Sequence, residues 1–114
     1  MYRAYIARGI RLAQAGKWVM TTQQRVHAHI EGRVQGVGFR YFVQTEAQKL
    51  GVTGWVRNRW NGGVEVVAEG DADVLETFIG VLRRGPSVAW VTNFQHHISE
   101  ATEEFKRFSV RRTA

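Results

Sequence analysis

The sequence of 114 residues contains no cysteine and no long apolar run. Without cysteine, the chain has no disulfide framework, no thiolate metal site and no cysteine nucleophile. This excludes a phosphatase that depends on a cysteine nucleophile, and it fits a cytoplasmic protein. No segment approaches the roughly 20 apolar residues that are needed to span a bilayer, so we expect no membrane association.

Acidic residues are missing from the first part of the chain. Residues 1–25 contain five of the 16 basic residues and no acidic residue. The remainder therefore has eleven basic and ten acidic residues, a net charge of only +1 out of a total of +6. Because nucleic-acid binding needs a local excess of basic residues, we expect no nucleic-acid partner for the part of the chain that folds.

This difference in composition also predicts where the domain begins. We expect a folded unit of residues 26–114, preceded by an extension of residues 1–25. The arginine-rich, acid-free extension has the composition of a transit peptide, but it lacks the continuous apolar region of a secretory signal. The simpler interpretation is a disordered extension, or a mis-assigned start with Met20 as the true first residue. On either interpretation, the extension contributes nothing to catalysis.

From Val26 onward, strand and helix patterns follow one another. Alternating apolar and polar residues, or short apolar runs, predict strands at residues 26–34, 52–57, 64–69, 91–98 and 105–110, the last of them short. Apolar residues at helical spacing predict one helix from Phe39 to Leu50 and a second between Asp71, a candidate N-cap, and Gly85. Two helices on one face of an antiparallel sheet would bury both apolar stripes. The fold class predicted is α+β, a ferredoxin-like βαββαβ sandwich.

A glycine-rich turn, Gly-Arg-Val-Gln-Gly-Val-Gly-Phe-Arg at residues 32–40, separates the first strand from the first helix. Glycines let the backbone approach a ligand closely, and successive N–H groups before a helix form a nest for an anion. Arg40 lies in the first helical turn, where a cation is unfavourable unless an anion lies nearby. Since a guanidinium also matches a phosphoryl group with two hydrogen bonds, the turn indicates phosphate binding. The alternative is an ordinary turn with a surface arginine.

Other phosphate-binding motifs do not fit this turn. The Walker A motif needs a Gly-Lys-Ser/Thr sequence, which does not follow these glycines. The dinucleotide motif needs a third glycine where the chain has Tyr41. These two modes of nucleotide binding are therefore not expected.

Two segments together resemble a known family. Gly32 to Arg40 resembles the acylphosphatase signature Gly-x-Val-Gln-Gly-Val-x-Phe-Arg at every fixed position, and Gly54-Trp55-Val56-Arg57-Asn58 with the following Gly-Val-Glu-Val resembles the second signature. The similarity extends from Val26 to about Val110 and leaves residues 1–25 outside. Trp60-Asn61 replaces the smaller or acidic turn residues of many relatives, which alters the rim of the site and touches no catalytic position.

The resemblance implies the reaction and its residues. A member of this family hydrolyses the carboxyl-phosphate bond of a small acyl phosphate to a carboxylate and inorganic phosphate, by in-line attack of water without a metal. By this resemblance Arg40 binds the substrate and Asn58 orients the water. The phosphate cradle would be the backbone amides of Gln35, Gly36, Val37, Gly38 and Phe39. We expect a cytoplasmic monomer without cofactors.

The four histidines do not predict a metal site. His27 and His29 share one face of the first strand, and His96 and His97 point to opposite faces of a later strand. Two histidines at this spacing can hold a metal ion, but the sequence offers no evident third ligand. We interpret all four as surface residues.

Two alternatives remain open at this point. Ferredoxin-like domains also act as non-catalytic modules that bind RNA or a regulatory partner, so the fold alone does not give the function. The same phosphate site also occurs in domains of hydrogenase-maturation proteins that handle carbamoyl phosphate. The short chain favours the free-standing enzyme.

Overall fold

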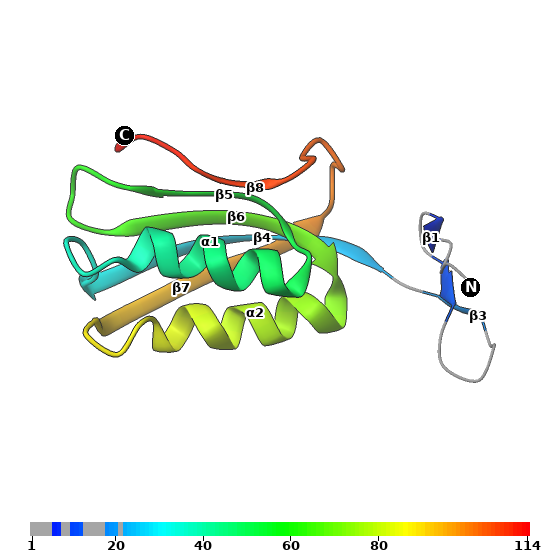
Figure 1. Cartoon of the computed structure of the whole chain (residues 1–114), viewed down its shortest axis with the longest axis horizontal. Helices are drawn as coiled ribbons and strands as arrows, with labels where there is room; N and C mark the ends of the chain where they lie inside the picture. Colours follow the sequence, from blue (N-terminus) through cyan, green and yellow to red (C-terminus); the bar gives the residue numbers. More distant parts are fainter. Residues whose placement is uncertain (1–5, 8–9, 13–17, 21) are drawn as a thin grey trace.

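The structure is a computed structural model that describes residues 6–7, 10–12, 18–20 and 22–114. Its main body is one sheet with two helices on one face (Figure 1). Its elements are β4 (Gln23–Arg33), α1 (Phe39–Leu50), β5 (Thr53–Asn58), β6 (Val64–Asp71), α2 (Ala72–Arg84), β7 (Trp90–Glu100) and β8 (Phe108–Val110). The order of the strands across this sheet is β7-β4-β6-β5-β8.

The predicted ferredoxin-like α+β fold is confirmed. β4, β5, β6 and β7 pair antiparallel, and both helices cover the same face, as Figure 1 shows. The fifth strand differs from the rest because β8 pairs with β5 in the parallel direction, aligning Phe108 with Gly54. The sheet is therefore mixed, with an antiparallel core of four strands and one parallel strand at its edge.

Three short strands precede this sheet. β1 (Ile6–Ala7), β2 (Ile10–Leu12) and β3 (Trp18–Met20) form a separate antiparallel sheet in the order β1-β2-β3. The prediction of a disordered extension or a mis-assigned start at residues 1–25 falls largely on residues outside those described, and it stays a prediction.

The core lies between the helices and one face of the sheet. Alternate residues of β4 and β6 point to that face, and Val26, Ala28 and Val66 there are fully buried. The helices contribute apolar stripes at helical spacing, with Phe39 and Val43 of α1 and four residues of α2 buried against the sheet. The two predicted helical stripes are thus the surfaces that cover the sheet.

β4 begins at Gln23, three residues before the predicted start at Val26, because polar side chains extend its pairing with β6. Arg25 donates from Nε to the buried carboxylate of Glu69 at 2.7 Å, and Gln23 donates to the side chain of Asp71. Asp71 is the N-cap of α2 by position, as predicted, but its side chain makes no capping hydrogen bond. The expected cap residue instead contributes to the pairing of two strands.

No helix of the described residues covers the other face of the sheet, which carries charged side chains. Glu65 and Glu69 of β6 are nearly fully buried there, with about 5% of each residue exposed. Burial acts to raise the pKa of each carboxyl group, but the hydrogen bonds that each accepts outweigh it, so both pKa values lie below the ordinary value of 4.5. Glu65 accepts from His27 and Arg57, and Glu69 accepts from Thr102 and Arg25.

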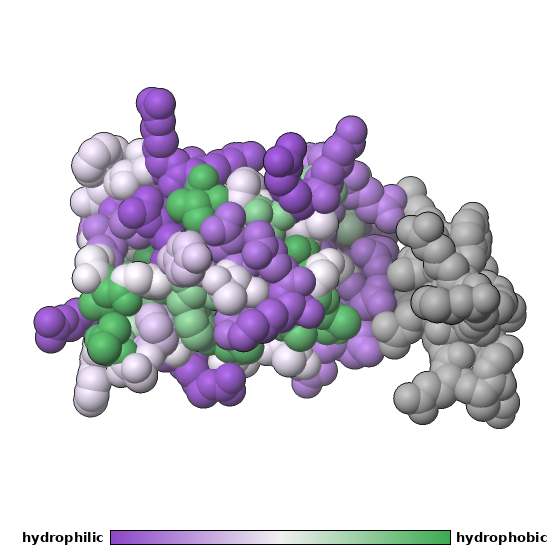
Figure 2. All heavy atoms as spheres, viewed as in Figure 1, coloured by the Kyte–Doolittle hydropathy of each residue, from purple (hydrophilic) through white to green (hydrophobic). Residues whose placement is uncertain are grey.

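The surface seen from the helix side is mixed in character. Figure 2 shows mostly hydrophilic residues, and the hydrophobic ones form separate small groups among those that are coloured. In the described part of the chain, neither α1, with 12 residues, nor α2, with 13, is long and apolar enough to cross a membrane.

Candidate active site

The glycine-rich turn between β4 and α1 bends through two left-handed residues. Gly36 has φ 73° and Gly38 has φ 77°, a region that residues with a side chain rarely adopt. Gly38 is the N-cap of α1, and its carbonyl accepts the first helical bond from Phe42 N at 3.0 Å. The next residue, Phe39, is 2% exposed. The buried ring therefore anchors the start of the helix directly behind the turn.

Asn58 approaches this turn from another part of the chain. It is the last residue of β5 and lies opposite Val64 of β6, on the side of the sheet that carries the helices. Its backbone carbonyl accepts from Ala114 N at 3.0 Å, and Ala114 O in turn accepts from Trp60 N at 3.2 Å. The C-terminal segment thus fixes the backbone on both sides of the position where β5 ends.

The turn, the start of α1 and the end of β5 enclose a pocket of about 460 Å³. Five predicted site residues line it, namely Gly36, Gly38, Phe39, Arg40 and Asn58. Gln35 and Val37, whose amides were also predicted to bind phosphate, are not among the lining residues. The remaining lining residues were not predicted from the sequence; they are Val34, Tyr41, Gln44 and Val110.

The pocket is electropositive because of how Arg40 is placed. Arg40 is the second residue of α1, whose first turn contains no acidic residue. No ion pair links Arg40 to any carboxylate of the described residues, although several other arginines have such partners. Arg40, which is partly exposed, and the positive end of the helix dipole therefore lie together at a pocket that no acidic residue of the described part of the chain lines. This arrangement suits a dianionic phosphoryl group.

The side chain of Gln35 has a function that sequence reasoning missed. Its Nε2 atom donates to Arg59 O at 2.7 Å and to Gly63 O at 2.8 Å. These two carbonyls belong to the turn that follows Asn58. Gln35 therefore joins the glycine-rich turn to the segment that carries the other half of the pocket.

Comparison with known proteins identifies the family. The sequence profile of the acylphosphatase family matches residues 26–110. The chain belongs to the acylphosphatase family. An acylphosphatase from Salinibacter ruber is 48% identical over 91 residues, which make up 80% of this chain and 96% of that relative.

Two solved structures are similar to this chain in overall fold. The crystal structure of the acylphosphatase from Bacillus subtilis matches with a TM-score of 0.75 and 42% identity, covering 77% of this chain and 98% of that one. Full-length HypF, in its phosphate- and nucleotide-bound form, matches with a TM-score of 0.74 and 32% identity over 82% of this chain but only 12% of HypF. The region that matches this chain is thus nearly all of the first protein and a small part of the second.

Proposed function

We propose that this chain hydrolyses small acyl phosphates, with Arg40 binding the phosphoryl group and Asn58 orienting the attacking water. The reaction class follows from membership of the acylphosphatase family, which also speaks against the alternative of a non-catalytic binding module. The assignment of residues is supported by one observation above all. Arg40 and Asn58, which are 18 positions apart in the sequence, line the same pocket together with the glycines of the turn.

In the proposed mechanism, the phosphoryl group lies in front of α1. The guanidinium of Arg40 and the backbone N–H groups of the turn, of which Gly36, Gly38 and Phe39 line the pocket, stabilise the negative charge on the equatorial oxygens. The side-chain amide of Asn58 accepts a hydrogen bond from the water molecule and holds it in line with the carboxylate leaving group. The P–O bond to the carboxylate breaks as the water oxygen attacks phosphorus, and the products are a carboxylate and inorganic phosphate.

A metal ion is not needed for these steps. The carboxylate of an acyl phosphate is a good leaving group, and an oxygen of the substrate can accept the proton of the water. Hydrolysis of benzoyl phosphate by the purified chain should therefore be unchanged by EDTA. A loss of activity in EDTA that added metal restores would contradict this mechanism.

The residue assignments are tested by two substitutions. Arg40→Ala removes the charge that stabilises the transition state, and we expect kcat for benzoyl phosphate to fall about 10²–10³-fold. Asn58→Ala leaves the water unoriented and should lower kcat about 10²-fold. Circular dichroism should show the native fold in both variants, because neither side chain is part of the core.

Matched substitutions away from the pocket serve as controls. Arg84→Ala removes an exposed arginine at the end of α2, and Asn93→Ala removes an exposed asparagine on β7. Both variants should retain nearly full activity. Near-native activity in Arg40→Ala or Asn58→Ala would refute the corresponding assignment.

The finer expectations of a monomer in the cytoplasm without a nucleic-acid partner stay predictions. The near-neutral charge of residues 26–114 supports the last of these. Light scattering of the purified chain tests the first.

A further inference from the structure

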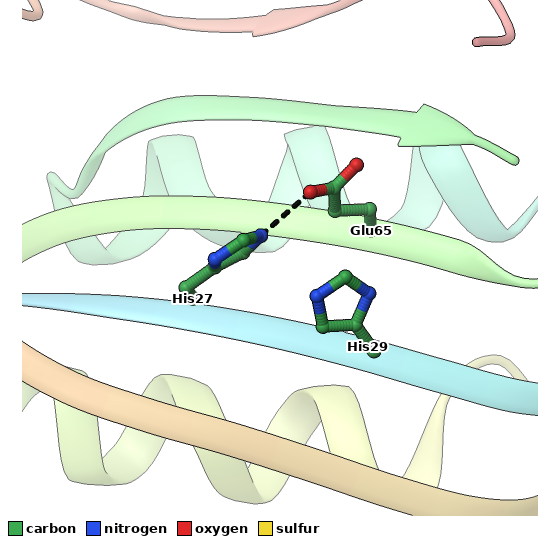
Figure 3. A group of neighbouring side chains, drawn as sticks. All are labelled: His27, His29 and Glu65. Atoms are coloured by element: carbon green, nitrogen blue, oxygen red, sulfur yellow. Dashed lines mark hydrogen bonds and ion pairs between the residues drawn. The ribbon is translucent and has the colours of Figure 1, made fainter.

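Two histidines and a glutamate meet on the face of the sheet opposite the one that α1 and α2 cover. His27 and His29 are on β4, and Glu65 lies directly opposite His29 on β6. Figure 3 shows the three side chains in front of the sheet, with the helices behind it. One ligand atom from each residue lies within 4.8 Å of the other two. The third ligand that the sequence did not reveal is therefore supplied by the neighbouring strand.

His27 lies at the surface, as expected, but it has a partner that the sequence did not reveal. Its Nε2 atom lies 2.6 Å from Oε2 of Glu65, and its side chain is only 41% exposed. The ring of His29 is more exposed, and its centroid lies 4.6 Å from that of His27. The two rings and the carboxylate thus form one cluster at the surface of the sheet.

We propose that His27, His29 and Glu65 bind a divalent transition-metal ion, with zinc as the best fit. Two imidazoles and one carboxylate form a ligand set that zinc uses in proteins, with water in the fourth position. Zinc–ligand bonds of about 2.0–2.1 Å place tetrahedral ligand atoms about 3.3 Å apart. To reach that spacing, the accessible His29 ring would rotate and the His27–Glu65 hydrogen bond would open as the ion binds.

The carboxylate of Glu65 is held in the orientation that such a site requires. Arg57 donates from Nε to Oε1 at 2.8 Å, and Arg59 approaches the same oxygen at 3.4 Å. The other oxygen, Oε2, faces His27. Hydrogen bonds of this kind orient metal ligands in known sites. Arg57 is therefore a positioning residue for the proposed ion.

The same two guanidinium groups select against hard cations. Calcium and magnesium bind through several oxygen ligands and depend on their negative charge. The cluster offers a single carboxylate with two arginines beside it. Imidazole nitrogen, in contrast, suits zinc, copper and nickel. The cluster should therefore bind zinc and discriminate against magnesium.

The proposed ion is separate from the catalytic pocket. Asn58 points to the side of the sheet that carries the helices, whereas Glu65 follows its partner Val64 and points to the other side. The ion would therefore bridge β4 and β6 behind the pocket without touching the substrate. Because the metal site does not depend on the proposed reaction, EDTA-insensitive hydrolysis and zinc binding can be tested separately.

Isothermal titration calorimetry of zinc chloride into the untagged full-length chain, at neutral pH in a non-chelating buffer, tests the proposal. We expect saturable binding at one ion per chain, with no corresponding heat from magnesium chloride. His29→Gln should weaken zinc binding at least about tenfold, in line with the effect of losing groups that support a metal site. His29 is exposed, so this variant should keep the fold.

His96→Gln is the matched control. His96 pairs with Ala28 across β4 and β7, which places it on the helix side of the sheet. The His96→Gln variant should therefore bind zinc with the same affinity as the unchanged chain. As a second measurement, zinc should raise the thermal midpoint of the unchanged chain and of His96→Gln, but not that of His29→Gln. Absence of saturable zinc binding, unchanged affinity in His29→Gln, or equal loss in His96→Gln would each overturn the proposal.

Discussion

Gln35 determines how the two halves of the active site are held together. The glycine-rich turn lines one side of the pocket and Asn58, at the end of β5, lines another. In the sheet, β4 and β5 are not paired directly, because β6 lies between them. The two hydrogen bonds from Gln35 to Arg59 O and Gly63 O make that connection. The spacing between the turn and Asn58 therefore depends in part on a residue that does not itself line the pocket.

Gln35→Ala should lower both stability and activity. Loss of two hydrogen bonds removes about 1–3 kcal/mol from the free energy of unfolding, measured by urea denaturation. We expect kcat for benzoyl phosphate to fall while the chain remains folded, because Asn58 is no longer aligned with the turn. Gln48→Ala, which truncates an exposed glutamine of α1, is the control and should change neither quantity. An active, destabilised Gln35→Ala chain would contradict the alignment role.

Sequence patterns identified some of these residues and missed others for a physical reason. Arg40 and Asn58 belong to linear motifs, so their spacing along the chain reveals them. The partners of Gln35 and of His27 lie on other segments. Alternation tells which face of a strand a residue occupies, but the partner on that face depends on the register between strands, which no local pattern contains.

At the scale of elements, the C-terminal segment completes the active site. After β8, Arg111 N donates to Val56 O at 2.8 Å, and Ala114 pairs with both Asn58 and Trp60. β5 is therefore covered on the side that β6 leaves open, up to Asn58. A strand end that is paired on both sides frays less than one at an edge.

Deletion of residues 112–114 should therefore impair the enzyme. The two backbone hydrogen bonds of Ala114 would be lost, at a cost of about 1–3 kcal/mol in stability. We expect lower kcat with native circular dichroism. The double substitution Arg112→Ala and Thr113→Ala keeps the backbone bonds and should retain activity. If the deletion and the double substitution lower kcat equally, the backbone hydrogen bonds of Ala114 are not what supports activity.

The elements themselves were largely predictable. Both helices and the antiparallel core follow from apolar periodicity, and α1 begins and ends where Phe39 and Leu50 were expected. The parallel attachment of β8 was not predicted, because a three-residue strand carries too little pattern to show its partner or its direction. The early start of β4 was missed because ion pairs and hydrogen bonds, rather than apolar residues, extend it.

At the scale of the whole molecule, stability should depend on acid through Glu69. This buried carboxylate accepts hydrogen bonds from Arg25 and from the backbone N–H groups of Thr102 and Glu103, which tie the segment between β7 and β8 to the sheet. Burial acts to raise the pKa of Glu69, but these hydrogen bonds have the opposite and larger effect, so the pKa lies below the ordinary 4.5. Its contribution to stability is thus complete above about pH 4.5 and is lost as the pH falls through the lowered pKa.

Glu69→Gln should flatten this dependence. The free energy of unfolding, measured by urea denaturation across acidic pH, should be roughly 1–3 kcal/mol lower at neutral pH and should fall less steeply in acid than that of the unchanged chain. Glu76→Gln, at an exposed position of α2, should follow the unchanged chain at every pH. If the free energy of unfolding of Glu69→Gln falls as steeply in acid as that of the unchanged chain, other carboxyl groups cause the loss of stability.

The pairing of Ala114 with Asn58 also limits how the enzyme can be handled. Any affinity tag, fluorescent fusion or surface linker attached after Ala114 starts beside the mouth of the pocket. The start of β4 lies at the opposite end of the sheet (Figure 1), far from the incoming acyl phosphate. An immobilised preparation should therefore be tethered through the N-terminal side, which leaves the entrance open to substrate.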